Sequence, residues 1–431
     1  MRSIKTIRLV YIIYSIYTLF VIMVSDYNIW IAILGLASIW SIFFFYSFGF
    51  YSYRSYKAVE SPKAPDNEDD TFLFSGIYEW KAWQYILSGI LCWLCSILAA
   101  RFYTSRGFTQ VISGLFRGDQ AAYSIYQHYV IDANIGTFSL TKIPYILMLV
   151  YCTVMLLWTM VGLIMSGEKL VLFKIVHLLN VILAYYYFGV ARGTNFEMYI
   201  VFVILVYSLL NRPGNTLKDE RRRKRSIIII AALAVVVVII FRAVVAARGN
   251  VFRNQICTEI KYDPNKWISQ TFPTITNMGL SVFRYFGFGI FTIGMIVDKV
   301  FLQDATGVIA HLIPCGFTLI KGEDLPSITR EVVDIGVGWV PDYISFINST
   351  GLIFTFAIFF LLGCLSARLY KSKRAALLKN LIGAVIFLEM LSIPVGNFIA
   401  TSTPNEISIL LILIWYFKGK RHISIGRRRI I

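Results

Sequence analysis

Long apolar runs alternate with short polar links over most of the chain. We expect membrane-spanning helices at 6–24, 29–50, 84–104, 143–165, 169–188, 196–211, 226–246, 351–370, 380–399 and 405–418. A helix needs about 20 mostly apolar residues to cross a hydrocarbon core that is ~30 Å thick. The pattern therefore predicts an all-α polytopic membrane protein with about 10 (10–12) transmembrane helices.

Basic residues in the links indicate the orientation of these helices. The link at 212–225 holds seven Lys or Arg, the link at 371–379 holds four and the tail from 418 holds six, whereas the links at 25–28 and 400–404 hold none. Lys and Arg in short loops mark the cytoplasmic side of a membrane. We therefore expect both termini to be cytoplasmic, and the loop 105–142, the turn 191–197 and the stretch 246–350 to face outward.

The stretch 246–350 is the longest polar part of the chain. It contains two apolar runs, 285–297 and 306–320, which are short for a span and are interrupted by Gly or Pro. We expect re-entrant or interfacial helices there, because broken backbone is tolerated at membrane depth when it is buried against protein. One tilted hairpin is the alternative. The predicted parts are then an N-terminal bundle of about seven spans (1–245), a large outward loop (246–350), and a C-terminal bundle of about three spans with a basic tail (351–431).

The composition agrees with a membrane protein. Of 431 residues, 57% are hydrophobic and 15% are charged, whereas a soluble domain carries about 25% charged residues. The net charge of +17 comes from basic residues that cluster at the ends of spans, so we expect membrane lipids and no nucleic acid as partner. Cys257 and Cys315 share the outward stretch and could form a disulfide bond.

Metal and nucleotide chemistry have no sequence signal in this chain. The four His are scattered, no DxD pair lies on an outward loop, and there is no Walker or GxGxxG loop. We therefore expect neither a metal site nor another cofactor.

Arginine side chains on the outward face are the candidates for substrate binding. Guanidinium groups bind phosphate oxygens bidentately and remain charged. We expect them to hold a lipid-linked pyrophosphate without a divalent ion and to stabilise it as a leaving group. The candidates are Arg192, Arg248, Arg253, Arg284 and Arg330. We expect Arg192, Arg248 and Arg284 to converge on one outward cavity; anchoring at the membrane interface is the alternative for each.

Other polar and aromatic residues complete the predicted site. Asn195 lies in the turn with Arg192, and Tyr285 and Trp339 could stack on sugar faces. If a sugar hydroxyl attacks, a general base is needed, and the candidates are Glu323, Asp324, Glu331 and His311, each of which could also be a structural or surface group. Glu389 is a further functional candidate, because ionisable residues inside spans are costly.

Three segments carry a family resemblance. They are GVARGTN at 189–195, YSIYQHYVIDANIGTFSLTKIPYILML at 123–149, and GVGWVPDYISFINSTGLIFTFAIFFLLGCLSARLY at 336–370. In these segments, and in HLIPCGFTLIKGEDLP before the last of them, the chain resembles the bacterial oligosaccharide repeat-unit polymerases, the Wzy-type O-antigen and surface-polysaccharide polymerases. Arg192 precedes Gly-Thr here, which departs from the family's pattern.

The resemblance implies a metal-independent glycosyltransferase with a lipid-linked donor. Such enzymes transfer a growing glycan from its polyprenyl (undecaprenyl) pyrophosphate carrier onto a new lipid-linked repeat unit. They act on the outer face of the bacterial inner membrane, beside a flippase and a chain-length regulator. An O-antigen ligase, which uses the same donor with lipid A core as acceptor, is one alternative. A flippase or transporter is another, and it predicts internal repeats and charged residues along a central path.

Overall fold

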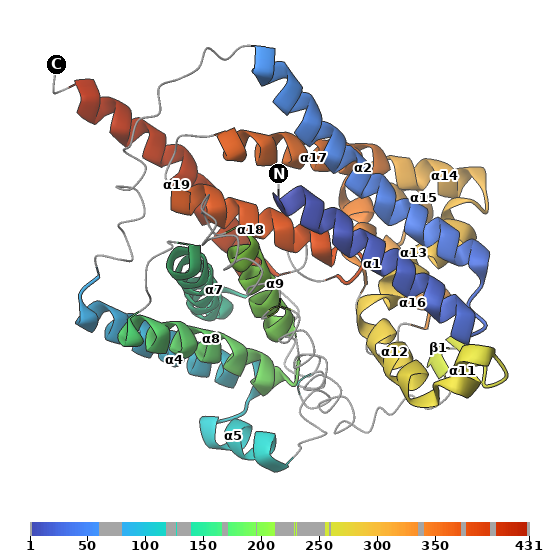
Figure 1. The fold of residues 1–431 in the computed structure, drawn as a ribbon, viewed down its shortest axis with the longest axis horizontal. Helices are drawn as coiled ribbons and strands as arrows, with labels where there is room; N and C mark the ends of the chain where they lie inside the picture. The colour runs from blue at the N-terminus through green and yellow to red at the C-terminus, as the bar shows by residue number, and fades with distance from the viewer. Residues whose placement is uncertain are drawn as a thin grey trace. The chain divides into compact units, whose positions relative to one another are not determined.

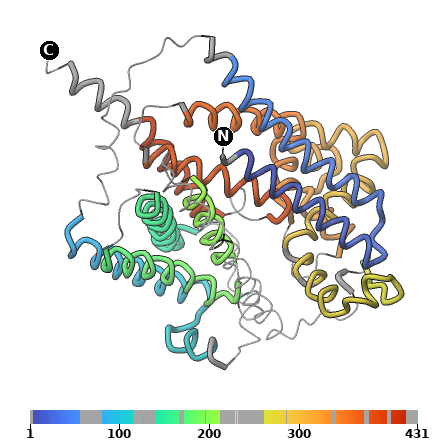
Figure 2. Tube along the Cα trace, in the orientation of Figure 1, coloured from blue at the N-terminus to red at the C-terminus, as the bar shows by residue number. Residues whose placement is uncertain are grey.

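The chain is almost entirely helical in the part that the structure describes. The computed structural model describes residues 2–59, 80–117, 126, 139–165, 171–194, 196–211, 228, 230, 255–257, 260–334, 340–371, 376–396 and 402–428. Figure 1 shows the helices, and Figure 2 shows the course of the chain through them.

The chain divides into two compact units, which we call unit 1 and unit 2. Unit 1 comprises Met1–Ala64, Val251–Lys371 and Glu389–Ser402, and unit 2 comprises Pro65–Asn250, Ser372–Leu388 and Thr403–Ile431. Neither unit is continuous in sequence. Most of the long polar stretch therefore lies in the same unit as the first two helices, whereas the parts 1–245, 246–350 and 351–431 predicted from the sequence follow chain order.

Six helices among the described residues are long and apolar enough to cross a membrane. They are α1 (Arg2–Val24), α2 (Ile29–Val59), α4 (Ala82–Thr104), α7 (Ile143–Met165), α8 (Leu172–Arg192) and α17 (Asp342–Lys371). They confirm six of the predicted spans and the expectation of an all-α polytopic membrane protein. The predicted number of about 10 spans is not confirmed, because some of the remaining helices are short.

The other predicted spans differ among themselves. The spans 196–211 and 405–418 correspond to shorter apolar helices, α9 (Phe196–Leu210) and the part Thr403–Phe417 of α19 (Thr403–Arg428). The span 380–399 corresponds to α18 (Ala376–Ser392), which ends just before Pro394, a residue that cannot continue a helix. The span 226–246 lies outside the described residues, apart from residues 228 and 230.

Unit 1 is built on close packing between α2 and α17. A Cβ atom on Gly49 would overlap the carbonyl oxygen of Phe360, and one on Gly363 would overlap that of Tyr46. The Tyr46 hydroxyl donates a hydrogen bond to Ser366 Oγ at 2.9 Å. Small residues allow helix backbones to approach closely in membranes, where dispersion contacts and hydrogen bonds stabilise helix pairs.

A bent helix pair in unit 1 occupies the first apolar run of the polar stretch. α12 (Pro273–Phe286) and α13 (Phe288–Ile296) meet near Gly287, and α13 continues into a π-helical turn, η3 (Val297–Phe301). The two arms bend by 57°, which is the geometry of a broken span or a re-entrant loop. Nearly every residue of α13 is buried. We expected re-entrant or interfacial helices at 285–297, and this placement in the membrane stays a prediction.

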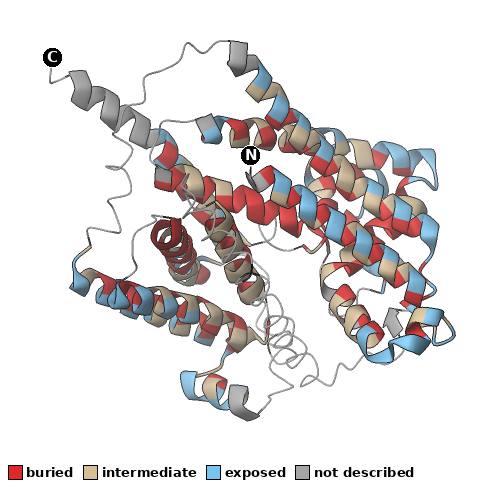
Figure 3. Ribbon diagram, viewed as in Figure 1, coloured by how far each residue is buried: buried red, intermediate tan, exposed pale blue. Residues whose placement is uncertain are grey.

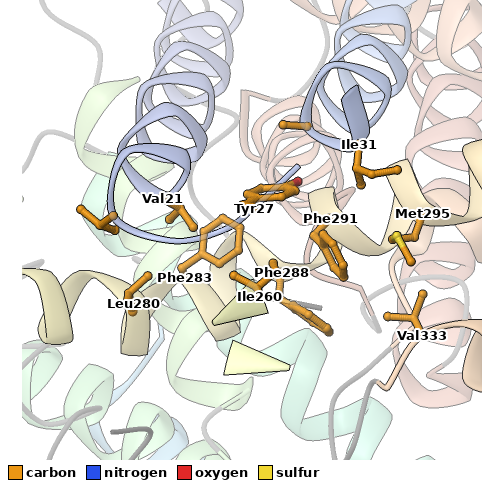
Figure 4. Packing of buried hydrophobic residues seen from close by; sticks show 12 residues of the cluster. Val21, Tyr27, Ile31, Ile260, Leu280, Phe283, Phe288, Phe291, Met295 and Val333 are labelled. Carbon is orange, nitrogen blue, oxygen red and sulfur yellow. The ribbon is translucent and has the colours of Figure 1, made fainter. Parts of the chain in front are cut away.

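Aromatic side chains fill the space around this bend (Figure 4). The ring of Tyr27 lies 6.0 Å from that of Phe283 and 5.3 Å from that of Phe291, measured between ring centroids. Val21 of α1 and Ile31 of α2 belong to the same cluster. Edge-to-face and tilted aromatic pairs at these separations are favourable beyond their buried area, so the cluster fixes the bent pair against α1 and α2.

The link between α1 and α2 is bound to a small sheet and to a lysine. β1 (Gln255–Cys257) pairs antiparallel with β2 (Ile260–Lys261), and Asp26 N donates to Lys261 O at 3.1 Å. Lys266, just before α11 (Trp267–Thr271), donates from Nζ to Ile22 O at 2.9 Å. A cation at the end of a helix satisfies its free carbonyl groups and its dipole.

The second apolar run forms two short helices instead of one. α14 (Ala305–Leu312) and α15 (Gly316–Lys321) expose Ile309 and Leu319, and α16 (Leu325–Val332) follows. Asn348 of α17 holds both turns, since its backbone oxygen accepts from Cys315 N at 3.1 Å and its side-chain oxygen accepts from Leu325 N at 2.9 Å. The re-entrant or interfacial placement expected at 306–320 stays a prediction.

Unit 2 contains α4, α7, α8, α9 and α19, with α5 (Phe108–Arg117) and the short η2 (Leu140–Lys142) at its loops. Trp93 Nε1 of α4 donates to Asn180 Oδ1 of α8 at 3.0 Å. The rings of Trp158 and Trp415 stack with centroids 4.3 Å apart. Most of α7 is buried (Figure 3), so it is a central helix of this unit.

Candidate functional site

A sharp turn at the end of α8 positions Arg192. Gly193 adopts the left-handed conformation (φ 68°) that ends many helices, and its N–H donates to Val190 O at 2.9 Å. Thr194 N then donates to Gly189 O at 2.8 Å. The turn therefore ends α8 at Arg192 and allows α9 to begin only four residues later.

Glu197, in the first turn of α9, binds Arg192. Arg192 Nη2 donates to Glu197 Oε1, and Thr194 Oγ1 donates to Glu197 Oε2 at 3.0 Å. Glu197 is only 3% exposed, and a Cβ atom on Gly189 would overlap its carboxylate. A carboxylate is also favoured at a helix N-terminus. The carboxylate is thus fixed from three sides and orients the guanidinium.

Aromatic rings and a second arginine surround the same turn. Arg192 Cζ lies 4.4 Å from the ring centroid of Phe188 and 5.8 Å from that of Tyr126, as in cation–π contacts. Arg192 Nε has no hydrogen-bond partner among the described residues. Arg106 Nη1 donates to Ala191 O at 3.4 Å. Two guanidinium groups therefore lie at one end of α8, and the Nε of one of them is buried without a partner among the described residues.

The other predicted arginines lie elsewhere. Arg284 is half-buried on α12 of unit 1, and Arg330 is exposed on α16. Arg248 and Arg253 lie outside the described residues, as do Asn195, Trp339 and the side chain of Tyr285. Because Arg192 and Arg284 belong to different units, the convergence of Arg192, Arg248 and Arg284 on one cavity stays a prediction.

The candidate bases of the polar stretch lie on α14 and around α16. Glu323, Asp324 and Glu331 are all exposed. Asp324 Oδ1 accepts from Ser327 N at 2.7 Å and so caps α16. This hydrogen bonding lowers the pKa of the Asp324 carboxyl, whereas an efficient general base has a pKa near the working pH. The geometry gives Asp324 a capping role, and a catalytic role for the three carboxylates stays a prediction.

His311 is half-buried on α14 and stacks on Phe301 of η3, with ring centroids 4.5 Å apart. Burial lowers the pKa of the His311 imidazole. The ring is therefore neutral at pH 7, which is the state that a base requires. Cys315, the residue just before α15, is a free, exposed thiol. The side chain of Cys257 lies outside the described residues, so a disulfide bond between the two stays a prediction.

Two acidic residues of unit 1 form a second candidate site, one at the start of α17 and one in the last residues of α18, most of which belongs to unit 2. Glu389 is 2% exposed and Asp342 is 0% exposed, and their carboxyl groups are close enough to interact electrostatically. The sequence marks Glu389, as an acid within a span, but gives no partner for it. Asp342 was missed, although an acid that directly follows Pro341 at the start of an apolar helix is the signal that could have marked it.

Glu197 was also missed as the partner of Arg192. The signal was the spacing R-G-T-N-F-E, in which a glycine turn brings residues five apart together. Among the described residues, no group of three or more His, Cys, Asp or Glu is arranged to hold a metal ion. No family model matches the chain, and no curated protein or solved structure is significantly similar to it.

Proposed function

We propose that this protein is a glycosyltransferase that polymerises polyprenyl-pyrophosphate-linked oligosaccharide repeat units into O-antigen or a related surface polysaccharide. The reaction would take place on the outer face of the bacterial inner membrane, with both termini cytoplasmic. The donor and acceptor are lipid-linked oligosaccharides, and a flippase and a chain-length regulator of the same pathway are the expected partners. The two guanidinium groups at the end of α8, those of Arg192 and Arg106, carry the proposal.

Arg192 is suited to binding a diphosphate because its orientation is fixed. Glu197 engages Nη2, which leaves Nε without a partner among the described residues. A phosphate oxygen at Nε would meet a donor that is already in position, so little side-chain entropy is lost on binding. Arg106, at the Ala191 carbonyl, adds a second positive charge close by, which suits the two phosphates of a pyrophosphate.

The same groups would assist the chemical step. A hydroxyl oxygen of the acceptor sugar bonds to the anomeric carbon of the donor, the bond from that carbon to the pyrophosphate oxygen breaks, and the electron pair leaves with the pyrophosphate. The hydroxyl proton passes to a base. Negative charge grows on the leaving oxygen, and a fixed guanidinium stabilises this charge more in the transition state than in the ground state.

The test uses purified full-length protein, a lipid-linked repeat unit as sole substrate, and EDTA. We expect a ladder of products that differ by one repeat unit. Arg192→Ala should lower the rate by about 100-fold or more, and Arg192→Lys should rescue poorly because the bidentate geometry is lost. Arg101→Ala is the matched control, since Arg101 is an exposed arginine in the last turn of α4 and should behave as wild type.

Two other outcomes would replace the proposal. Transfer of a glycan to lipid A core without a ladder would identify an O-antigen ligase. Transport is favoured by one observation, the buried acids Asp342 and Glu389 inside apolar helices, because such residues mark ion and proton paths. Movement of the intact lipid-linked unit across the leaflets of a vesicle, with no glycosidic bond formed, would identify a flippase.

A further inference from the structure

Asp342 and Glu389 lie where α17 begins and α18 ends. Both are buried, and neither oxygen of Glu389 has a hydrogen-bond partner among the described residues. An ionised carboxyl without partners is very costly in apolar surroundings, and such groups become neutral instead. The arrangement therefore disfavours a negative charge on Glu389.

The described groups that face Glu389 supply no positive charge. Tyr11 and Tyr14 of α1 face the end of α18, but their hydroxyls donate to backbone oxygens, to Met390 O at 2.9 Å and to Leu391 O at 3.1 Å. Tyr46 of α2 lies next to Tyr11. α13, which also packs here, contains no titratable residue. Among the described residues, Asp342 is the one charged group whose field acts on Glu389.

The helix ends distinguish the two carboxyl groups. Asp342 is in the first turn of α17, where the positive end of the helix dipole stabilises an anion. Glu389 lies three residues before the end of α18, where the negative end disfavours one. Two neighbouring carboxyl groups in such a site do not both ionise. The proton belongs on Glu389 and the negative charge on Asp342.

We propose that Asp342 and Glu389 form a proton-binding site, in which the pair holds one proton and Glu389 carries it. The inference does not depend on glycosyl transfer, because it concerns whether a proton is bound at these two carboxyl groups and not whether a sugar is transferred.

The site lies at a junction of broken helices. Tyr343 N donates to Ile393 O at 3.3 Å, and a Cβ atom on Gly289 of α13 would overlap the carbonyl oxygen of Pro394. Loss of the proton would place two carboxylates together at this junction and would repel α17 from the end of α18.

The experiment is infrared spectroscopy of the full chain in lipid nanodiscs, as a function of pH. At pH 7, the difference between the infrared spectra of wild type and Glu389→Gln should contain the carbonyl band of one neutral carboxyl group. Glu406→Gln is the control, since Glu406 is an exposed acid in the first turn of α19, and its difference should contain carboxylate bands. Carboxylate bands in the Glu389→Gln difference would overturn the proposal.

A second variant keeps the proposal testable if Glu389→Gln does not fold. Asp342→Asn removes the negative neighbour, so Glu389 should ionise more easily. The neutral carboxyl band should disappear at a pH about one unit or more below its midpoint in wild type. An unchanged midpoint would show that the two groups do not share a site and would overturn the inference.

Discussion

Arg192 and Glu197 form an ion pair across the turn that joins α8 to α9, with Arg192 Nη2 donating to Glu197 Oε1. The pair explains why a positive charge is tolerated in a short turn between two apolar helices. It also fixes the guanidinium at a defined position, whether or not a substrate is bound. The same contact thus supports both the fold of unit 2 and the proposed binding of pyrophosphate.

Removing Glu197 should destabilise unit 2. Glu197→Ala leaves the guanidinium partly buried without its carboxylate, and such losses cost up to about 3–5 kcal/mol for fully buried pairs. We expect less here, because the Arg192 side chain is 21% exposed. Thermal melting of both single variants and the double variant would measure the coupling. Additive effects of the two substitutions would contradict a direct interaction.

Gly289→Ala should disrupt unit 1. The new Cβ atom would overlap the carbonyl oxygen of Pro394, and backbone cannot move away as a flexible side chain can. Overpacking of this kind costs about 1–3 kcal/mol, so the melting temperature should fall by several degrees. Gly107→Ala is the control, because a Cβ atom there contacts only Gln110 Oε1, at 3.8 Å. Equal stability of the two variants would show that α13 does not pack against Pro394.

The cap of α16 should give a pH dependence at acid pH. Hydrogen bonding from Ser327 lowers the pKa of Asp324. The ionised Asp324 carboxylate therefore stabilises the fold fully above the ordinary pKa of Asp, and this stabilisation is lost as pH falls through the lowered pKa. Asp324→Ala should cost about 1 kcal/mol near pH 7. Asp324→Asn should keep the cap but lose its pH dependence, which melting curves from pH 7 down to pH 3 would reveal.

His311 should contribute a separate pH dependence near neutrality. Burial lowers its pKa from the ordinary 6.5, so the unfolded chain binds a proton more readily than the fold. Stability should therefore fall as pH drops below 6.5 and level off below the lowered pKa. His311→Phe keeps the stacking on Phe301 and should remove this loss between pH 7 and pH 5. Identical pH profiles for the two proteins would show that His311 remains accessible to protons in the fold.

Labelling of Cys315 would test the orientation. The thiol is free and exposed, and we predicted from the sequence that it lies on the outer side of the membrane. The experiment uses cells whose inner membrane is intact and can be reached by reagents from outside. A membrane-impermeant thiol reagent should label the Cys257→Ser variant of the protein in these cells. The additional substitution Cys315→Ser should abolish the labelling. Labelling that requires inside-out vesicles would reverse the proposed topology.

The sequence predicted the helices of the membrane bundle well. Six spans appear at the expected positions, because a long apolar run has one low-energy solution in a bilayer, a hydrogen-bonded helix. A break near Gly287 was also predictable, since the glycines of the run 285–297 are local features. The run 306–320 was harder, because Cys315 adopts a left-handed conformation (φ 51°) that its residue type does not predict.

The structure adds contacts that the sequence did not indicate at two of the predicted site residues. The sequence marked Arg192 but not its ion pair with Glu197. Residues five apart come into contact here only because the chain turns at Gly193. For Asp324, which the sequence marked as a candidate base, the fold adds a capping bond to α16.

The sequence by itself determined the all-α membrane class and the positions of its longest helices, because burial in lipid depends on local composition and length. The tertiary structure alone brought Asp342 to Glu389, two residues on different helices of the chain. It also placed Tyr11 and Tyr14 at the end of α18. Contacts between distant segments depend on how helix surfaces fit together, and no local pattern of residues specifies that fit.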